Sequence, residues 1–192
     1  EIMTREIDHR VMNSLQFVAS LLNLQSRRAT APETTEELKM AATRVAAVAR
    51  VHRHFYARGA AKTVDGLTYL QRLCRDLSSI LQATIVVEGT AGTIPTSQIV
   101  PIGLLVNELV TNAVKHGTGR VDVMFTGADA DNFLLTIADE GPGLPPGFDA
   151  AQSRGLGMKV IASLVSALKG RWHADRKAVG AGAVFSITFP RS

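Results

Sequence analysis

Three polar side chains recur at every fourth residue in a mostly apolar stretch near residues 97–116. Glu108, Asn112 and His116 are spaced by four, so a helix would place them along a single stripe. A carboxylate and an amide one turn apart suit a magnesium ion and its water ligands. The neighbouring Lys115 adds a positive charge for a phosphate. Taken alone, this stripe is weak evidence, because a polar helix face is more often simply solvated.

A second candidate site lies where a predicted strand over 132–138 ends. Asp139 follows the strand, and its carboxylate can accept a hydrogen bond from an exocyclic amine such as that of adenine. Gly141 and Gly143 come next and would let the backbone approach a ligand closely. A plain tight turn explains the same residues, and by itself this segment favours that interpretation.

Two further glycine-rich segments follow. Gly155, Leu156 and Gly157 open a predicted helix over 157–169, where free backbone amides form a binding site for phosphates. Gly182 stands directly before the last predicted strand, 183–189. Each segment is weak evidence alone, but the four occur in a definite order and spacing.

This series resembles the nucleotide-binding boxes of the GHKL superfamily, over about residues 97–190. The resemblance implies that Asn112, with Glu108, binds Mg²⁺ and that Asp139 reads the adenine of ATP. Glu108 falls where the superfamily's ATPases keep a glutamate that activates water. The other expected ATP contacts are Lys115, His116, Gly141, Gly143, Gly155, Leu156, Gly157 and Gly182.

The start of the chain carries a different motif. His9 and Arg10 are followed by Asn13, then by Leu-Gln at 15–16 and by Ser-Leu-Leu-Asn-Leu-Gln at 20–25. The series resembles the phosphoacceptor helix of the second HisKA family of sensor histidine kinases, although Met12 and Ser14 replace a usual Lys and Asn. An imidazole is a competent nucleophile at neutral pH, because its reference pKa is about 6.5. We expect His9 to accept the phosphoryl group, with Asp8 or Asn13 orienting the ring or accepting a proton.

Helical periodicity runs through residues 1–58. In the first helix, Val11, Leu15, Val18, Leu22 and Gln25 follow one another in alternating steps of four and three, which places them in one seam along the helix. Positions from Leu38 to Phe55 form a similar seam in the second helix. We expect Pro32 to break the first helix and Thr34 or Thr35 to cap the second. The pattern predicts an antiparallel hairpin. Two such hairpins would complete a four-helix bundle, which implies a homodimer.

After a predicted linker at 59–64, helices and strands alternate. We predict helices over 65–82, 97–116 and 157–169, and strands over 84–88, 120–127, 132–138, 171–176 and 183–189. The fold class is therefore α+β. A dimerisation and phosphoacceptor hairpin, 1–58, precedes an α/β-sandwich ATP-binding domain of the GHKL (Bergerat) type, 65–192.

Composition narrows the function further. The 192 residues are 46% hydrophobic, which is enough for a buried core, and no apolar run is long enough to span a membrane. The net charge of +4 arises in residues 1–62, with ten Lys/Arg and six Asp/Glu, whereas residues 63–192 hold eleven of each. Without a dense basic cluster, nucleic acid is not an expected partner. The single cysteine, Cys74, suits a small core position and a cytoplasmic location.

Together, the two resemblances imply a two-component sensor histidine kinase. ATP would phosphorylate His9, and the phosphoryl group would pass to an aspartate on the receiver domain of a response regulator. One alternative is a histidine phosphotransferase with a vestigial ATP domain. Another is a GHKL serine kinase of the anti-sigma type, which explains the nucleotide boxes but not the hairpin.

Overall fold

The chain divides into two compact units, Glu1–Ala61 and Lys62–Ser192, each described here by itself. The computed structural model describes residues 2–56, 62–90, 92–117, 119–145, 148, 156–177 and 181–191, without side chains at 2–10, 52–56 and 156. Within these ranges, no helix combines the length and the apolar character needed to cross a membrane.

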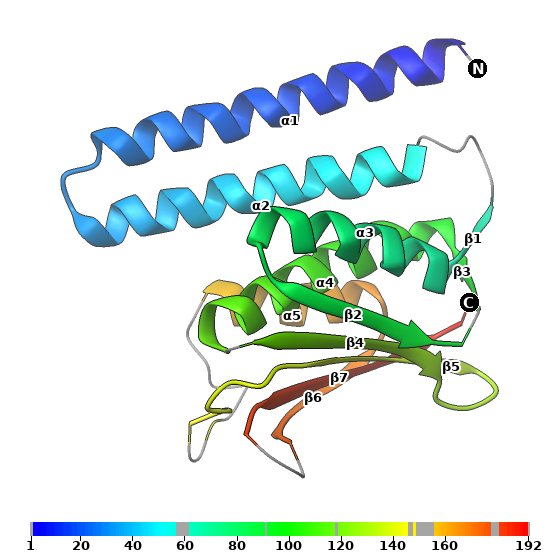
Figure 1. Cartoon of the computed structure of the whole chain (residues 1–192). Helices are drawn as coiled ribbons and strands as arrows, with labels where there is room; N and C mark the ends of the chain where they lie inside the picture. The colour runs from blue at the N-terminus through cyan, green and yellow to red at the C-terminus, as the bar shows by residue number, and fades with distance from the viewer. Residues whose placement is uncertain are drawn as a thin grey trace. The chain divides into compact units, whose positions relative to one another are not determined.

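The first unit is the predicted helical hairpin, built from α1 (Ile2–Arg28) and α2 (Pro32–Tyr56) (Figure 1). The predicted start of the second helix is wrong, because α2 begins at Pro32 itself. Proline suits the first helical position, since its fixed φ is helical and it lacks an amide that would be unsatisfied there. Thr35 is already inside the helix, where its hydroxyl and amide both donate to the carbonyl of Ala31, at 3.1 and 3.0 Å.

The seam of α1 also differs from the predicted one. Leu15 and Leu22 are partly buried as expected, but the buried side chains described in α1 are Ala19 and Ser26. The Ser26 hydroxyl is satisfied by the carbonyl of Asn23 at 2.9 Å. Val11 and Val18 are instead exposed, and so is Gln25. The seam of α1 therefore combines Leu15 and Leu22 with the small residues Ala19 and Ser26, and it leaves Val11 and Val18 exposed.

The second unit is built on a five-stranded sheet in the order β2-β4-β5-β7-β6. Its strands are β2 (Thr84–Gly89), β4 (Arg120–Gly127), β5 (Asn132–Ala138), β6 (Arg171–Arg176) and β7 (Ala183–Pro190). Only the pairing of β2 with β4 is parallel, and the others are antiparallel. The strands match the predicted ranges to within one residue.

Three helices cover one face of this sheet: α3 (Gly66–Leu81), α4 (Thr96–His116) and α5 (Leu156–Ala167) (Figure 1). The apolar residues of α3 recur at helical spacing and are buried, among them Leu70, Leu73 and Leu77. Cys74 lies in the same stripe, and burial raises the pKa of its thiol to about 12. The thiol therefore stays protonated and serves as a core residue, as predicted.

A two-stranded sheet, β1 (Thr63–Asp65) with β3 (Thr93–Pro95), was not expected. Part of it occupies the predicted linker at 59–64. Its strands have three residues each, which is too short for an alternating pattern to stand out. Ile94 is fully buried, so this small sheet contributes to the core.

Asp65 gives a prediction about stability. Its carboxylate caps α3 by accepting the amide of Thr68 at 2.7 Å, and hydrogen bonds from the Thr68 side chain and amide lower the pKa of Asp65 below 3.8. We expect Asp65→Ala to lower the free energy of unfolding by about 1 kcal/mol at pH 7. Urea titrations followed by the fluorescence of the sole tryptophan, Trp172, would measure this.

The pH dependence separates the charged cap from packing. A carboxylate whose pKa is lower in the folded than in the unfolded protein stabilises the fold at pH values above the unfolded pKa. That stabilisation is lost as the pH falls through the folded pKa. The difference in the free energy of unfolding between the native protein and Asp65→Ala should therefore become smaller below pH 3.8. Asp65→Asn, which can still cap, should lose less. An equal deficit at all pH values would contradict the role of the carboxylate.

Candidate functional site

Asp139 lies just beyond the end of β5 and is buried, with 7% of its surface exposed. Its Oδ1 accepts the amides of Gly141 at 2.8 Å and Ala183 at 3.2 Å. The Asp139 amide in turn donates to the carbonyl of Ala183 at 3.0 Å. The backbone therefore fixes Oδ1, whereas Oδ2 accepts no hydrogen bond from the described residues.

Glycines surround this carboxylate because nothing larger fits. A Cβ on Gly141 would overlap the Cα of Gly117 and lie 3.1 Å from Oδ1 of Asp139. A Cβ on Gly182 would overlap the carbonyl oxygen of Asp139, and the φ of Gly182 is +133°. The structure therefore brings Gly141 and Gly182, both predicted site residues, together at Asp139.

The polar stripe on α4 changes from buried to exposed toward the end of the helix, which lies beside Asp139. Glu108 is 9% exposed, Asn112 is half-buried, and Lys115 and His116 are exposed on the last turn. The next residue, Gly117, is so close to Asp139 that an added Cβ would lie 3.0 Å from the aspartate Cβ. The open end of the stripe is therefore adjacent to the aspartate, although the two are distant in sequence.

The third predicted segment opens α5. Leu156 is the first residue of this helix and Gly157 the second, and α5 packs against α4. The first amides of a helix have no intrahelical partner and attract anions. Gly155 and the side chain of Leu156 lie outside the described residues.

Glu108 and Asn112 are chemically suited to Mg²⁺, which prefers oxygen ligands and often takes one or two from the protein and the rest from phosphates and water. They lie one turn apart on α4. Across the described parts of the chain, no group of three His, Cys, Asp or Glu side chains could hold a metal by itself. The donor set thus fits a magnesium ion that arrives with a polyphosphate.

The predicted residues of the hairpin are less fully described. Asn13 is exposed on α1. Asp8 and His9 belong to the same helix, but their side chains lie outside the described residues.

Sequence reasoning missed several contributors to the site. Gly117 and Ala183 both contact Asp139. One signal was available in the sequence, because Gly117 comes directly after the last residue of the predicted helix over 97–116. The bond from Ala183 joins residues 44 positions apart, so no local pattern could reveal it.

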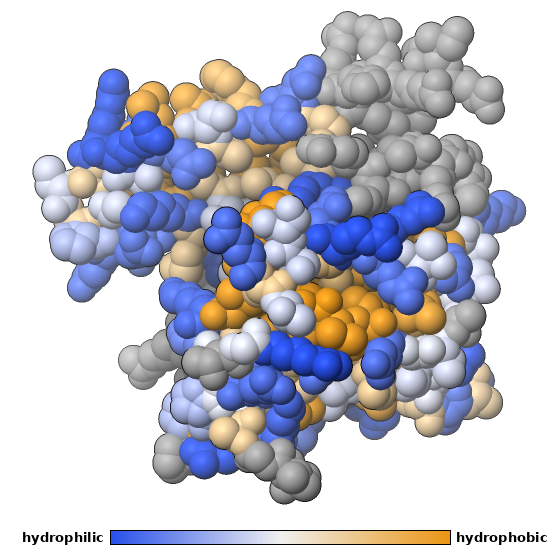
Figure 2. Space-filling model, viewed as in Figure 1, coloured by the Kyte–Doolittle hydropathy of each residue, from blue (hydrophilic) through white to orange (hydrophobic). Residues whose placement is uncertain are grey.

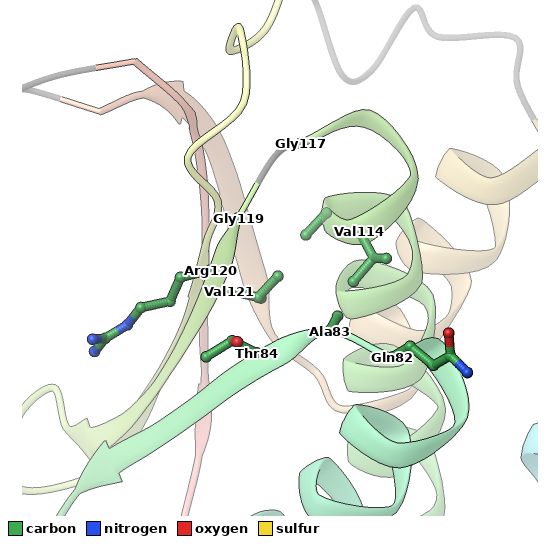
Figure 3. Close-up of a pocket in the computed structure, with 9 residues that line it drawn as sticks. Gln82, Ala83, Thr84, Val114, Gly117, Gly119, Arg120 and Val121 are labelled. Atoms are coloured by element: carbon green, nitrogen blue, oxygen red, sulfur yellow. The ribbon is translucent and has the colours of Figure 1, made fainter.

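The described residues of this unit also line two cavities, one of which reaches Gly117 beside Asp139. One cavity has a volume of about 260 Å³ and is lined by residues that include Ala83, Val114 and Val121. Arg120 also lines it, but its side chain points away from α4 (Figure 3). A shallower groove of about 590 Å³ includes Arg75, Ile85 and Val87, and Figure 2 shows apolar surface where α3 lies over the sheet. None of the predicted nucleotide ligands lines either cavity.

Comparison with known proteins agrees with this geometry. Residues 97–192 match the family model described as histidine kinase-, DNA gyrase B- and HSP90-like ATPase. Residues 6–81 match a histidine kinase model of the second HisKA family. The fold class predicted from the sequence, a helical hairpin followed by an ATP-binding α/β domain, is thereby confirmed.

Individual relatives point the same way. The sensor histidine kinase PdtaS of Mycobacterium tuberculosis is 31% identical over 85% of this chain and 34% of its own length. Blue-light-activated histidine kinase 2 of Erythrobacter litoralis is 28% identical over 97% of this chain and 56% of its own length. A solved blue-light activated histidine kinase of Erythrobacter litoralis has the same fold, with a TM-score of 0.72 at 21% identity, over 97% of this chain and 59% of that chain. The chain thus spans about a third to just over half of these relatives.

The fixed orientation of Asp139 predicts the effect of Asp139→Asn. The amide oxygen of Asn can keep the two backbone bonds, which leaves its NH₂ group where Oδ2 was. If Asp139 reads adenine as the sequence predicts, a donor would then face the exocyclic amine of adenine, which is also a donor. We expect affinity for ATP to fall roughly tenfold to a hundredfold, the cost of about 1–3 kcal/mol for a mispaired buried group.

Calorimetry with ATP and GTP on the native protein and the variant would measure this. Thermal unfolding should be nearly unchanged, because the bonds from Gly141 and Ala183 persist. Equal affinity of the native protein for ATP and GTP would rule out adenine recognition by Asp139.

Proposed function

The chain belongs to the histidine kinases, and from that membership we propose that it is the core of a two-component sensor kinase. In this proposal, His9 takes the γ-phosphoryl group of ATP and passes it to an aspartate on a response-regulator receiver domain. The observation that carries the nucleotide part is the buried Asp139, which two backbone amides hold through Oδ1, and we propose that Oδ2 accepts the hydrogen bond from adenine.

The nucleotide would be held at three points. Asp139 accepts a hydrogen bond from the adenine amine. Lys115 and His116, exposed on the last turn of α4, supply donors for the phosphates. The first amides of α5 face the same phosphates. Glu108 and Asn112 hold Mg²⁺, which when bound neutralises charge on the phosphates.

The chemical step needs little from the protein beyond positioning. An imidazole nitrogen of His9 forms a bond to the γ-phosphorus as the bond to the oxygen of ADP breaks. In this proposal, Asp8 or Asn13 orients the ring or accepts the imidazole proton, and Asn13 follows His9 by one turn of α1. In the second step the phosphoryl group leaves His9 for a carboxylate oxygen of the receiver.

The proposed setting is cytoplasmic, with a receiver domain as the partner and no nucleic acid involved. The basic balance of residues 1–62 supports this partner, because the phosphorylated aspartate of a receiver lies in an acidic pocket. Opposite charges speed the encounter between two proteins more than they strengthen the final complex.

The hairpin offers a surface for a homodimer. An apolar set on α1, here called the α1 ridge, stays exposed: Val11, Phe17, Val18, Leu21 and Leu24. Phe17 is 64% exposed and Leu21 42%, unusual values for large side chains on a two-helix hairpin. A second hairpin packed on this ridge would complete a four-helix bundle.

We therefore predict that Leu21→Asp weakens self-association. The buried charge should raise the dimer dissociation constant by a factor of ten or more, since unpaired charges are costly in an apolar interface. Sedimentation velocity over a concentration series would measure it. Gln16→Asp, an exposed polar position on the same helix, is the matched control. A native protein that stays monomeric at every concentration would contradict the dimer.

The central test is autophosphorylation with radiolabelled ATP. His9→Ala should abolish incorporation of label while leaving ATP affinity nearly unchanged, because His9 lies in the hairpin and the nucleotide ligands lie in the other unit. His173→Ala, an exposed histidine on β6, should label normally. The native label should be labile to acid, as phosphohistidine is. Acid-stable label would instead indicate a serine kinase, and label retained by His9→Ala would exclude His9.

A further inference from the structure

Arg176, the last residue of β6, makes a contact that the proposed nucleotide chemistry does not use. Its Nε and Nη2 both donate to the carbonyl oxygen of Leu144, at 3.0 and 2.7 Å. The two residues are 32 positions apart in the chain. A guanidinium that directs two donors at one oxygen holds that oxygen in both distance and direction, which a single bond would not do.

Leu144 directly follows the glycine loop that begins beside Asp139. The amide of Gly141 is bonded to Oδ1 of Asp139, so one end of the segment 141–144 is fixed there. The other end is fixed by Arg176. Between them, Gly143 has a φ of +79°, and an added Cβ would lie 2.9 Å from the carbonyl oxygen of Gly182. The loop is thus held at both ends and packs against the β6–β7 connection.

The same connection supports the aspartate. Lys177 donates its amide to the carbonyl of Gly182 at 3.0 Å, and the next residue, Ala183, exchanges hydrogen bonds with Asp139. Arg176 therefore joins two structures that meet at one carboxylate. One is the glycine loop after β5, and the other is the connection before β7.

We infer that Arg176 is a positioning residue for adenine recognition, which sets the glycine loop at 141–144 against Asp139 without touching the nucleotide itself. This inference rests on the proposed function, since it requires that Asp139 bind adenine. It also makes a distinction that the residue type alone would not suggest. An arginine near a nucleotide site is ordinarily expected to bind phosphate, whereas this one is directed at a backbone carbonyl.

The test compares adenosine, ADP and ATP binding to the full chain by calorimetry, with displacement titrations for the weakest ligand. A loop defect at the base end should weaken all three by a similar factor. We expect about five- to tenfold for Arg176→Ala, the scale of losing a hydrogen bond of ordinary strength. Arg176→Lys keeps the charge but not the paired donors, so it should restore little of the affinity.

Two further variants sharpen the result. Arg171→Ala removes an exposed arginine from the other end of β6 and should leave all three affinities unchanged. Gly143→Ala strains the backbone of the same loop without changing Arg176, because the φ of Gly143 is +79°. It should lower the affinities for adenosine, ADP and ATP by a similar factor. Thermal unfolding of each variant shows whether the unit remains folded.

A loss that grows with the number of phosphates would overturn the inference, because it would show direct contact with phosphate. A lower unfolding temperature of Arg176→Ala with unchanged affinities for all three ligands would also overturn it, because Arg176 would then contribute to stability alone. Restoration of affinity by Lys would exclude the need for paired donors. Failure of the native protein to bind any adenine ligand would instead reject the proposed function.

Discussion

A buried carboxylate must have partners, and at Asp139 those partners are backbone amides. Two of them, from Gly141 and Ala183, bind the same oxygen. Backbone donors cannot rotate away as side chains can, so the orientation of the carboxylate is set by the course of the chain. Much of the second unit can be understood as the framework that brings these two amides to the end of β5.

That requirement explains why the surrounding positions are glycines. The backbone must approach the aspartate from the end of α4, from the loop after β5 and from the connection before β7. At Gly117, Gly141 and Gly182, a single methyl group would collide with a neighbouring backbone or with Asp139. The glycines are thus explained by lack of space more than by flexibility.

The sequence predicted what depends on local pattern. The helices and strands of the second unit follow from apolar spacing, and the motif at Asn112 and Asp139 was recognisable from order alone. The predictions were wrong where two local patterns conflict or where the local pattern is weak. Pro32 can end one helix or begin another, and the seam of α1 follows small residues, Ala19 and Ser26, that carry a weak apolar signal. The bonds of Asp139 with Ala183 and of Arg176 with Leu144 are tertiary, so no stretch of sequence contains them.

The position of β7 in the sheet has a consequence for biosynthesis. This strand, residues 183–190, pairs with β5 on one side and with β6 on the other, so it is an inner strand formed by a late part of the chain. The two helices of the hairpin follow each other in the chain and pack together, so the hairpin can fold before the second unit is complete. The second unit must wait, with β5 unpaired on one edge, until residue 190 has emerged. During translation the nascent chain therefore presents a finished helical hairpin beside an open sheet edge, which is the state in which it is most exposed to aggregation and to chaperones.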